Sequence, residues 1–112
     1  MKTLNQIRDE AHKLAKEKGW HSFEETNNQF RMRAILLMHS ELSELVELLR
    51  NETLHSQCDK PIDLTCEEEE IADVFIRAFD YCGRMKIDID RAIKLKHDYN
   101  KTRSIRHGDK KA

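Results

Sequence analysis

The stretch ILLMHSELSELVELL, residues 35–49, decides the fold of this chain. Its apolar residues recur at helical spacing and form one broad face, which predicts a long amphipathic α-helix. Glu41 falls inside that apolar face and Glu44 lies at its edge, whereas Glu47 points to the opposite side. A carboxylate in an apolar face is costly unless it is paired or bound to a metal ion. Glu41 and Glu44 are therefore candidates for a functional role.

A second pair of carboxylates, Glu70 and Asp73, lies in the segment EEIADVFIRAF, residues 69–79. Both pairs are spaced i, i+3, so the two side chains of each pair lie on one side of a helix. Glu70 borders the apolar face of its helix, while periodicity alone places Asp73 on the polar side. Four carboxylates that converge from two helices need cations between them. Mg²⁺ fits this role because it takes oxygen ligands and usually leaves positions open for substrate phosphates.

The composition predicts a single all-α domain over residues 1–112. The chain has three Gly, one Pro and 37% charged residues, a balance that favours long helices with few tight turns. Capping boxes at residues 3–6 and 65–68 mark the starts of two helices. We expect helices over residues 4–18, from 26–28 to 50, over 65–83, and from a cap at Asp88 onward. The remaining segments are a loop over residues 51–64 and a polar, basic tail over residues 104–112.

The third predicted helix has a wider apolar arc than one core contact requires. Its apolar side chains point in two directions, and a chain this small offers too few neighbours to cover both. We therefore expect a four-helix-bundle-like fold that is completed in a homodimer or homotetramer through a self-complementary interface. The side chains concerned are Ile71, Val74 and Ala78 on one side and Phe75, Ile76 and Phe79 on the other.

Several classes of protein do not fit the sequence. No apolar run reaches membrane-spanning length and the N-terminus lacks a signal-peptide pattern, so we expect a cytoplasmic protein with no membrane partner. Three cysteines without a CxxC motif do not suggest a disulfide framework. The spacing of His55, Cys58 and Cys66 matches no common zinc pattern.

The charges are distributed unevenly, although the net charge is only −1. Residues 41–73 carry eleven acidic and two basic side chains, whereas residues 91–112 carry eight basic and two acidic ones. This asymmetry suggests a half that holds metal and a half that holds phosphate, or else two surfaces that simply neutralise each other. A nucleic-acid partner is not expected, because the basic stretch is short and the whole chain is not basic.

The order of these motifs resembles the MazG-like all-α nucleoside triphosphate pyrophosphatases, specifically their small single-domain members. Their pattern of ExxE, a variable gap, ExxD, and then Lys and Asn or Arg on the next helix is matched by ELSE at 41–44, by EIAD at 70–73, and by Lys96, Asn100 and Arg103. The segment KGW at 18–20 and the ending YNKTRSIRHGDK at 99–110 are also similar to family segments. The tail departs from the family at Ser104 and Asp109. The resemblance covers residues 4–110.

The resemblance implies Mg²⁺-dependent hydrolysis of a (deoxy)nucleoside triphosphate to the monophosphate and pyrophosphate, a house-cleaning activity on the nucleotide pool. Mn²⁺ is a possible substitute metal. The implied metal ligands and catalytic residues are Glu41, Glu44, Glu70 and Asp73, one of which would act as base. The implied substrate-binding residues are Lys96, Arg103 and Arg106 for the phosphates, Asn100 for the sugar or a phosphate, and Trp20 for the base.

Two other classes compete with the enzyme. The chain is alternatively a non-catalytic helical assembly or nucleotide-binding module, in which the apolar faces are interfaces and the acidic residues serve solubility. A diiron carboxylate bundle is a weaker alternative, because it requires Glu-x-x-His motifs that the acidic sites lack. Trp20 is equally suited to closing the core, and His39 is expected on the surface or at an interface.

Overall fold

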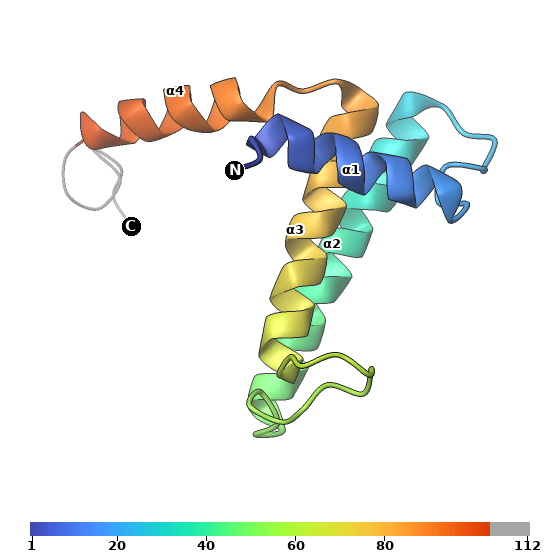
Figure 1. The fold of residues 1–112 in the computed structure, drawn as a ribbon, viewed down its shortest axis with the longest axis vertical. Coiled ribbons are helices and arrows are strands. Elements are labelled where there is room, and N and C mark those ends of the chain that lie inside the picture. The colour runs from blue at the N-terminus through green and yellow to red at the C-terminus, as the bar shows by residue number, and fades with distance from the viewer. Residues whose placement is uncertain (104–112) are drawn as a thin grey trace.

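The computed structural model describes residues 1–103, and these residues form four α-helices and no strand (Figure 1). The helices are α1 (Leu4–Glu17), α2 (Asn27–Arg50), α3 (Cys66–Met85) and α4 (Ile89–Lys101). The predicted all-α class is confirmed. The predicted tail over residues 104–112 lies outside the described part of the chain. Within residues 1–103, no helix is long and apolar enough to cross a membrane.

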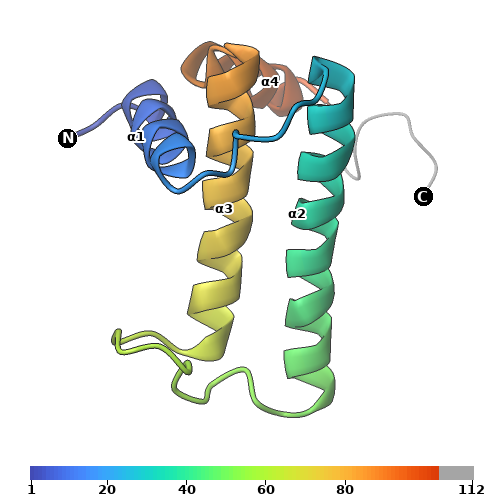
Figure 2. The same cartoon turned by 90° about the vertical axis from the view of Figure 1, so that its right-hand side faces the viewer.

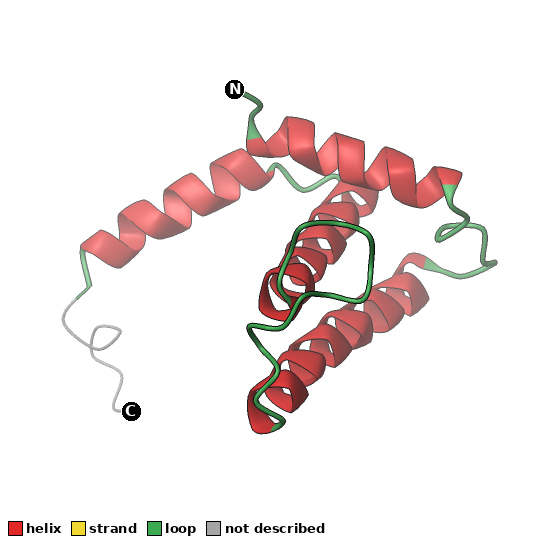
Figure 3. Ribbon diagram, turned by 60° about the horizontal axis from the view of Figure 1, so that its bottom comes forward, coloured by secondary structure: helices red, strands yellow, loops and turns green. Residues whose placement is uncertain are grey.

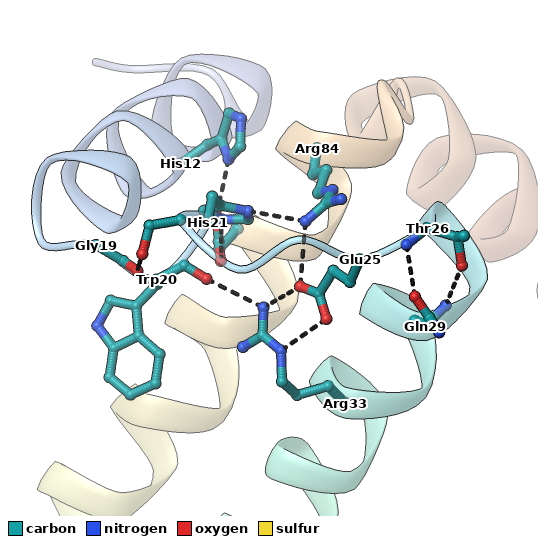
Figure 4. Close-up of polar contacts among 11 residues, drawn as sticks. His12, Gly19, Trp20, His21, Glu25, Thr26, Gln29, Arg33 and Arg84 are labelled. Carbon is teal, nitrogen blue, oxygen red and sulfur yellow. Dashed lines mark hydrogen bonds and ion pairs between the residues drawn. The ribbon is translucent and has the colours of Figure 1, made fainter.

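The first three helices each begin with a capping box. A threonine hydroxyl at the N-cap accepts a hydrogen bond from the backbone three residues on, and the Gln or Glu at that position accepts one from the threonine backbone N–H. The predicted boxes at residues 3–6 and 65–68 are both present, and a third box, between Thr26 and Gln29, opens α2 (Figure 4). Each box satisfies N–H groups that a helix start otherwise leaves free. Asp88 caps α4 as expected.

The sequence predicted that the third helix ends near Gly83, and this glycine lies inside α3, two residues before its last residue. The helix continues to Met85 and ends at Lys86, which adopts the left-handed conformation with φ of 56°. A Cβ atom at position 83 would lie 2.5 Å from the Cβ of His12 on α1. Glycine is therefore required here because it lets α1 approach α3 closely.

The helices form a long antiparallel pair crossed at one end by α1. α2 and α3 run side by side (Figure 2), and the loop of residues 51–65 joins them at the end far from α1 (Figure 3). α4 points away from this pair and packs on α1, whose first backbone N–H groups, at Leu4 and Asn5, donate to the Asp90 carboxylate over 3.2 and 3.0 Å. A single chain therefore does not close into a four-helix bundle.

The buried face of α2 is centred on Phe30, Ala34 and Glu41. These three residues share one side of the helix because they are spaced by four and seven positions. The sequence predicted that the neighbouring apolar residues also face the core. They remain exposed instead, because α3 alone covers only part of so wide an arc. These exposed residues of α2 are Ile35, Leu42, Val46 and Leu49. Ile71, Phe75 and Ile76 on α3 are exposed too, in line with the prediction that one chain does not cover both apolar sides of that helix.

Candidate metal centre and adjoining cavity

Three of the four predicted carboxylates converge between α2 and α3. Glu41 and Glu44 come from successive turns of α2, and Glu70 comes from the first half of α3. One carboxylate oxygen from each residue lies within 4.8 Å of the other two. Glu41 is buried, with 6% of its surface exposed, whereas Glu44 is exposed and Glu70 is half-buried. The cluster is therefore open to solvent on the Glu44 side and enclosed on the Glu41 side.

The surroundings of Glu70 oppose ionisation of its carboxyl group. Burial, together with hydrogen bonding to Glu44 and Glu41, raises the pKa of Glu70 to about 8. Its Oε2 atom is buried and has no hydrogen-bond partner among the described residues. Burial works against ionisation of Glu41 too, but hydrogen bonds from Glu70 and Arg77 outweigh it and lower the Glu41 pKa. At neutral pH the cluster thus holds a proton where a cation would also fit.

Asp73 lies next to the trio but is not one of its members. It follows Glu70 by one turn of α3 and is half-buried, although helical periodicity placed it on the polar side. Burial and the charges of Glu41 and Glu69 raise its pKa, against the opposing charges of Arg77 and Lys60. The charge of Glu41 therefore affects the pKa of Asp73, although the Asp73 carboxylate is not one of the three that cluster together.

A cavity of about 350 Å³ lies between α1, α2 and α3. Apolar residues of all three helices line most of it, and Trp20 and Phe30 provide aromatic surface. The charged residues of the lining are Glu10, Lys18, Arg33, Arg77 and Asp80. Trp20 remains 45% exposed, so it borders the cavity without closing the core. Such a largely apolar cavity with a few polar groups is typical of small-molecule sites.

Arg77 connects the cavity with the carboxylates. Its Nε donates to Oε1 of Glu41 over 2.8 Å, and its guanidinium carbon lies 5.3 Å from the centre of the Trp20 ring. A cation so placed compensates the buried Glu41 charge and packs on the indole face. Sequence reasoning did not identify Arg77, because its two partners are far away in the chain: Glu41 lies on α2, and Trp20 lies in the loop between α1 and α2.

A second network, also missed from sequence, joins α1, the 18–26 loop and α3 (Figure 4). The Asp80 carboxylate bonds to Nδ1 of His12 over 2.8 Å and to Nε2 of His21 over 2.7 Å. Arg84 lies 3.5 Å from Nδ1 of His21 and also pairs with Glu25. Because Arg84 can only donate, this contact makes Nδ1 of His21 an acceptor, and the Nε2–H group of His21 then donates to the Asp80 carboxylate. The two histidines and Asp80 are close enough to hold a metal ion, but hydrogen bonding already accounts for their arrangement.

The predicted substrate-binding residues of α4 do not meet the carboxylates within one chain. Lys96 and Asn100 are exposed on α4, which projects away from the α2–α3 pair (Figure 1). Lys96 and Arg103 both lie over the Tyr99 ring, at 5.1 and 5.6 Å from its centre. Arg106 lies outside the described residues. Glu47 and His39 are exposed, as the helical pattern predicted.

Comparison of the chain with protein-family models, curated proteins and solved structures finds no match. The assignment of function therefore depends on the motifs and on the geometry of the carboxylate cluster and the cavity.

Proposed function

We propose that this chain is a Mg²⁺-dependent nucleoside triphosphate pyrophosphohydrolase of the MazG-like class. The observation that carries the proposal is the trio of Glu41, Glu44 and Glu70 around a buried, unpartnered Glu70 oxygen. Native proteins leave few buried polar atoms without a partner, and a bound cation would supply one for this oxygen. The donor set suits Mg²⁺, because carboxylate oxygens are the ligands that this ion prefers.

The residues of the trio would hold the ion, with Asp73 one turn further along α3 as an additional carboxylate. When bound, Mg²⁺ supplies charge neutralisation for the phosphates and lowers the pKa of coordinated water. Water would add to the α-phosphorus, and the bond from that phosphorus to the oxygen of the β-phosphate would break. A carboxylate of the site would take the proton of the water, and pyrophosphate would leave.

The cavity would hold the base of the nucleotide. Trp20 offers an aromatic face for stacking, and Phe30 lines the inner wall. Arg77 lies between this cavity and Glu41, so a base beside Trp20 would have its phosphates directed toward the carboxylates. The Asp80 carboxylate, fixed by two histidines, offers an acceptor for an amino group of the base.

A second copy of the chain would complete the site. The exposed apolar residues of α2 and α3 form a surface that water contacts unfavourably, and a two-fold partner would bury it. The same partner would bring its α4, with Lys96, Asn100 and Arg103, toward carboxylates that α4 does not reach within one chain. We therefore propose a homodimer or homotetramer.

The product pattern tests the proposal. A panel of ribo- and deoxyribonucleoside triphosphates is incubated with the protein and Mg²⁺, and the products are separated by ion-exchange chromatography. Monophosphate and pyrophosphate in equal amounts support the proposal, whereas diphosphate and orthophosphate contradict it. The exposed apolar surface also favours the alternative of a helical assembly module, and that alternative predicts no product from any nucleotide, with or without metal.

A further inference from the structure

Arg77 uses only part of its hydrogen-bonding capacity in the structure. Its Nε donates to Glu41, while its two terminal nitrogens have no hydrogen-bond partner within residues 1–103. The side chain is 27% exposed and lines the cavity beside Trp20. A guanidinium has five N–H donors in a planar fork that suits phosphate oxygens. Arg77 therefore presents unused donors at the junction of the cavity and the carboxylates.

The charge of Arg77 is needed only while the carboxylates lack another cation. Glu41 is buried, so its negative charge requires compensation, which Arg77 provides. A divalent ion held by Glu41, Glu44 and Glu70 would provide the same compensation and would repel the guanidinium. Metal binding would thus weaken the hold of Glu41 on Nε of Arg77 and leave the whole side chain free to move toward another anion.

Three other cations near the site pair with carboxylates outside the trio. Lys60 pairs with Asp59 and Glu69, two acidic neighbours outside the trio. Arg33 also lines the cavity, but it pairs with Glu25 and donates to the backbone carbonyl of Trp20, and Arg84 pairs with Glu25 as well. Arg77 is the cation that the structure places between the carboxylate trio and the aromatic wall of the cavity.

We propose that Arg77 binds the phosphate chain of the substrate, and that in the metal-free protein the Arg77 guanidinium is paired with Glu41 instead. The inference rests on the proposed function and adds to it a phosphate-binding residue from within α3. Arg77 leaves Glu41 when a metal ion takes over that carboxylate, and its fork then turns to phosphate oxygens near Trp20. Arrival of the metal and capture of the nucleotide are thereby linked through one side chain.

The variants Arg77→Met and Arg77→Lys separate this role from a purely structural one. Mg²⁺ binding without nucleotide is measured by calorimetry. Nucleotide binding is measured with Mg²⁺ and the α,β-imido analogues of dUTP and dATP, through the fluorescence of Trp20, the single tryptophan. Loss of the competing cation in Arg77→Met should tighten Mg²⁺ binding by at least ~3-fold and weaken analogue binding by at least ~10-fold.

Arg77→Lys keeps a cation on Glu41 but loses the planar fork. It should leave Mg²⁺ affinity within ~3-fold of wild type and weaken analogue binding by at least ~3-fold. The matched control is Arg50→Met, which breaks an exposed pair with Glu47 on α2 and should change neither affinity. Circular dichroism confirms that each variant is folded.

The outcomes distinguish the inference from the proposed function. If wild type binds no Mg²⁺, both fail together. If wild type binds Mg²⁺ and the analogues, but Arg77→Met weakens both in parallel, Arg77 only supports Glu41 and the inference is overturned. Opposite changes in the two affinities support it.

Discussion

The substitution Glu70→Gln should make the metal-free protein more stable while it removes metal binding. Glu70 has a buried Oε2 without a partner among the described residues, and its pKa is raised from 4.5 to about 8, first by burial and then by Glu44 and Glu41. The amide of Gln has nearly the same shape, carries no charge, and can donate to both neighbouring carboxylates. It therefore satisfies the cluster in the way that the protonated acid does.

The expected gain in stability follows from the proton that Glu70 takes up on folding. At pH 7 an unfolded Glu70 with a pKa of 4.5 is ionised, whereas the folded side chain is mainly protonated. Protonating it at pH 7 costs about 3 kcal/mol at 1.36 kcal/mol per pH unit. Allowing for imperfect hydrogen bonds of the amide, we expect a gain of about 1–3 kcal/mol, which is about 4–12 °C in melting temperature.

The gain should depend on pH in a defined direction. Because the folded pKa of Glu70 is raised, its carboxyl favours the folded state most below pH 4.5 and loses that advantage as the pH rises to about 8. The difference in stability between Glu70→Gln and wild type should therefore be small near pH 4.5 and largest near pH 8. Carboxyl groups outside the cluster titrate in both proteins, so the difference reports on Glu70 together with Glu41, whose pKa a hydrogen bond with Glu70 lowers.

Thermal unfolding followed by circular dichroism, at one protein concentration, measures both effects. In EDTA the variant should melt above wild type, and added Mg²⁺ should raise the melting temperature of wild type but not that of the variant. Glu47→Gln, on the exposed side of α2, is the control and should match wild type in both conditions. If Glu70→Gln melts below wild type in EDTA, the reasoning about the carboxylate cluster is refuted.

Three further predictions concern the carboxylates, the packing of α1 and the oligomeric state. Glu41→Gln and Asp73→Asn should each remove most hydrolysis and keep the helical circular dichroism signal, whereas the control Glu47→Gln should hydrolyse the substrate like wild type. If either Glu41→Gln or Asp73→Asn keeps activity within ~3-fold of wild type, about 0.65 kcal/mol in barrier, the metal assignment is contradicted. Gly83→Ala should destabilise the fold by about 1–3 kcal/mol in chemical unfolding, because its Cβ would meet His12 at 2.5 Å, and unchanged stability argues against this packing. Light scattering should give two or four times the chain mass of 13.3 kDa, and the single-chain mass would show that no partner covers the apolar surface.

The features predicted correctly from sequence depend on short-range spacing. A capping box needs residues three apart, and helical periodicity alone predicted that Glu41 lies in the apolar face of its helix, where it is indeed buried. The convergence of Glu41 and Glu44 with Glu70 could be predicted from the sequence, because two pairs of carboxylates at helical spacing are separated by a loop of suitable length. The position of Asp73 was harder to predict from the sequence, because its partial burial depends on how α2 and α3 are rotated relative to each other.

The features missed from sequence involve residues far apart along the chain. Arg77 pairs with Glu41 across 36 positions, and His21 bonds to Asp80 across 59. The residues that flank an arginine or a histidine in the sequence do not indicate such a distant partner. Gly83 suggests a helix end because glycine is common there, but the close approach of α1 is the reason for it. The direction of α4 follows from the contact with α1, which periodicity does not reveal.

The most direct test of the central claim is pyrophosphate release from a mixture of nucleoside triphosphates, measured for wild type and for Glu44→Gln. Glu44 is the exposed member of the trio, so its replacement changes the metal site with little effect on packing. Wild type should release pyrophosphate with Mg²⁺ or Mn²⁺ and none in EDTA, and the variant should be slower by at least ~30-fold, about 2 kcal/mol in barrier. Release that is unaffected by EDTA or by the substitution, or no release from any nucleotide, would contradict the assignment of this chain as a metal-dependent pyrophosphohydrolase.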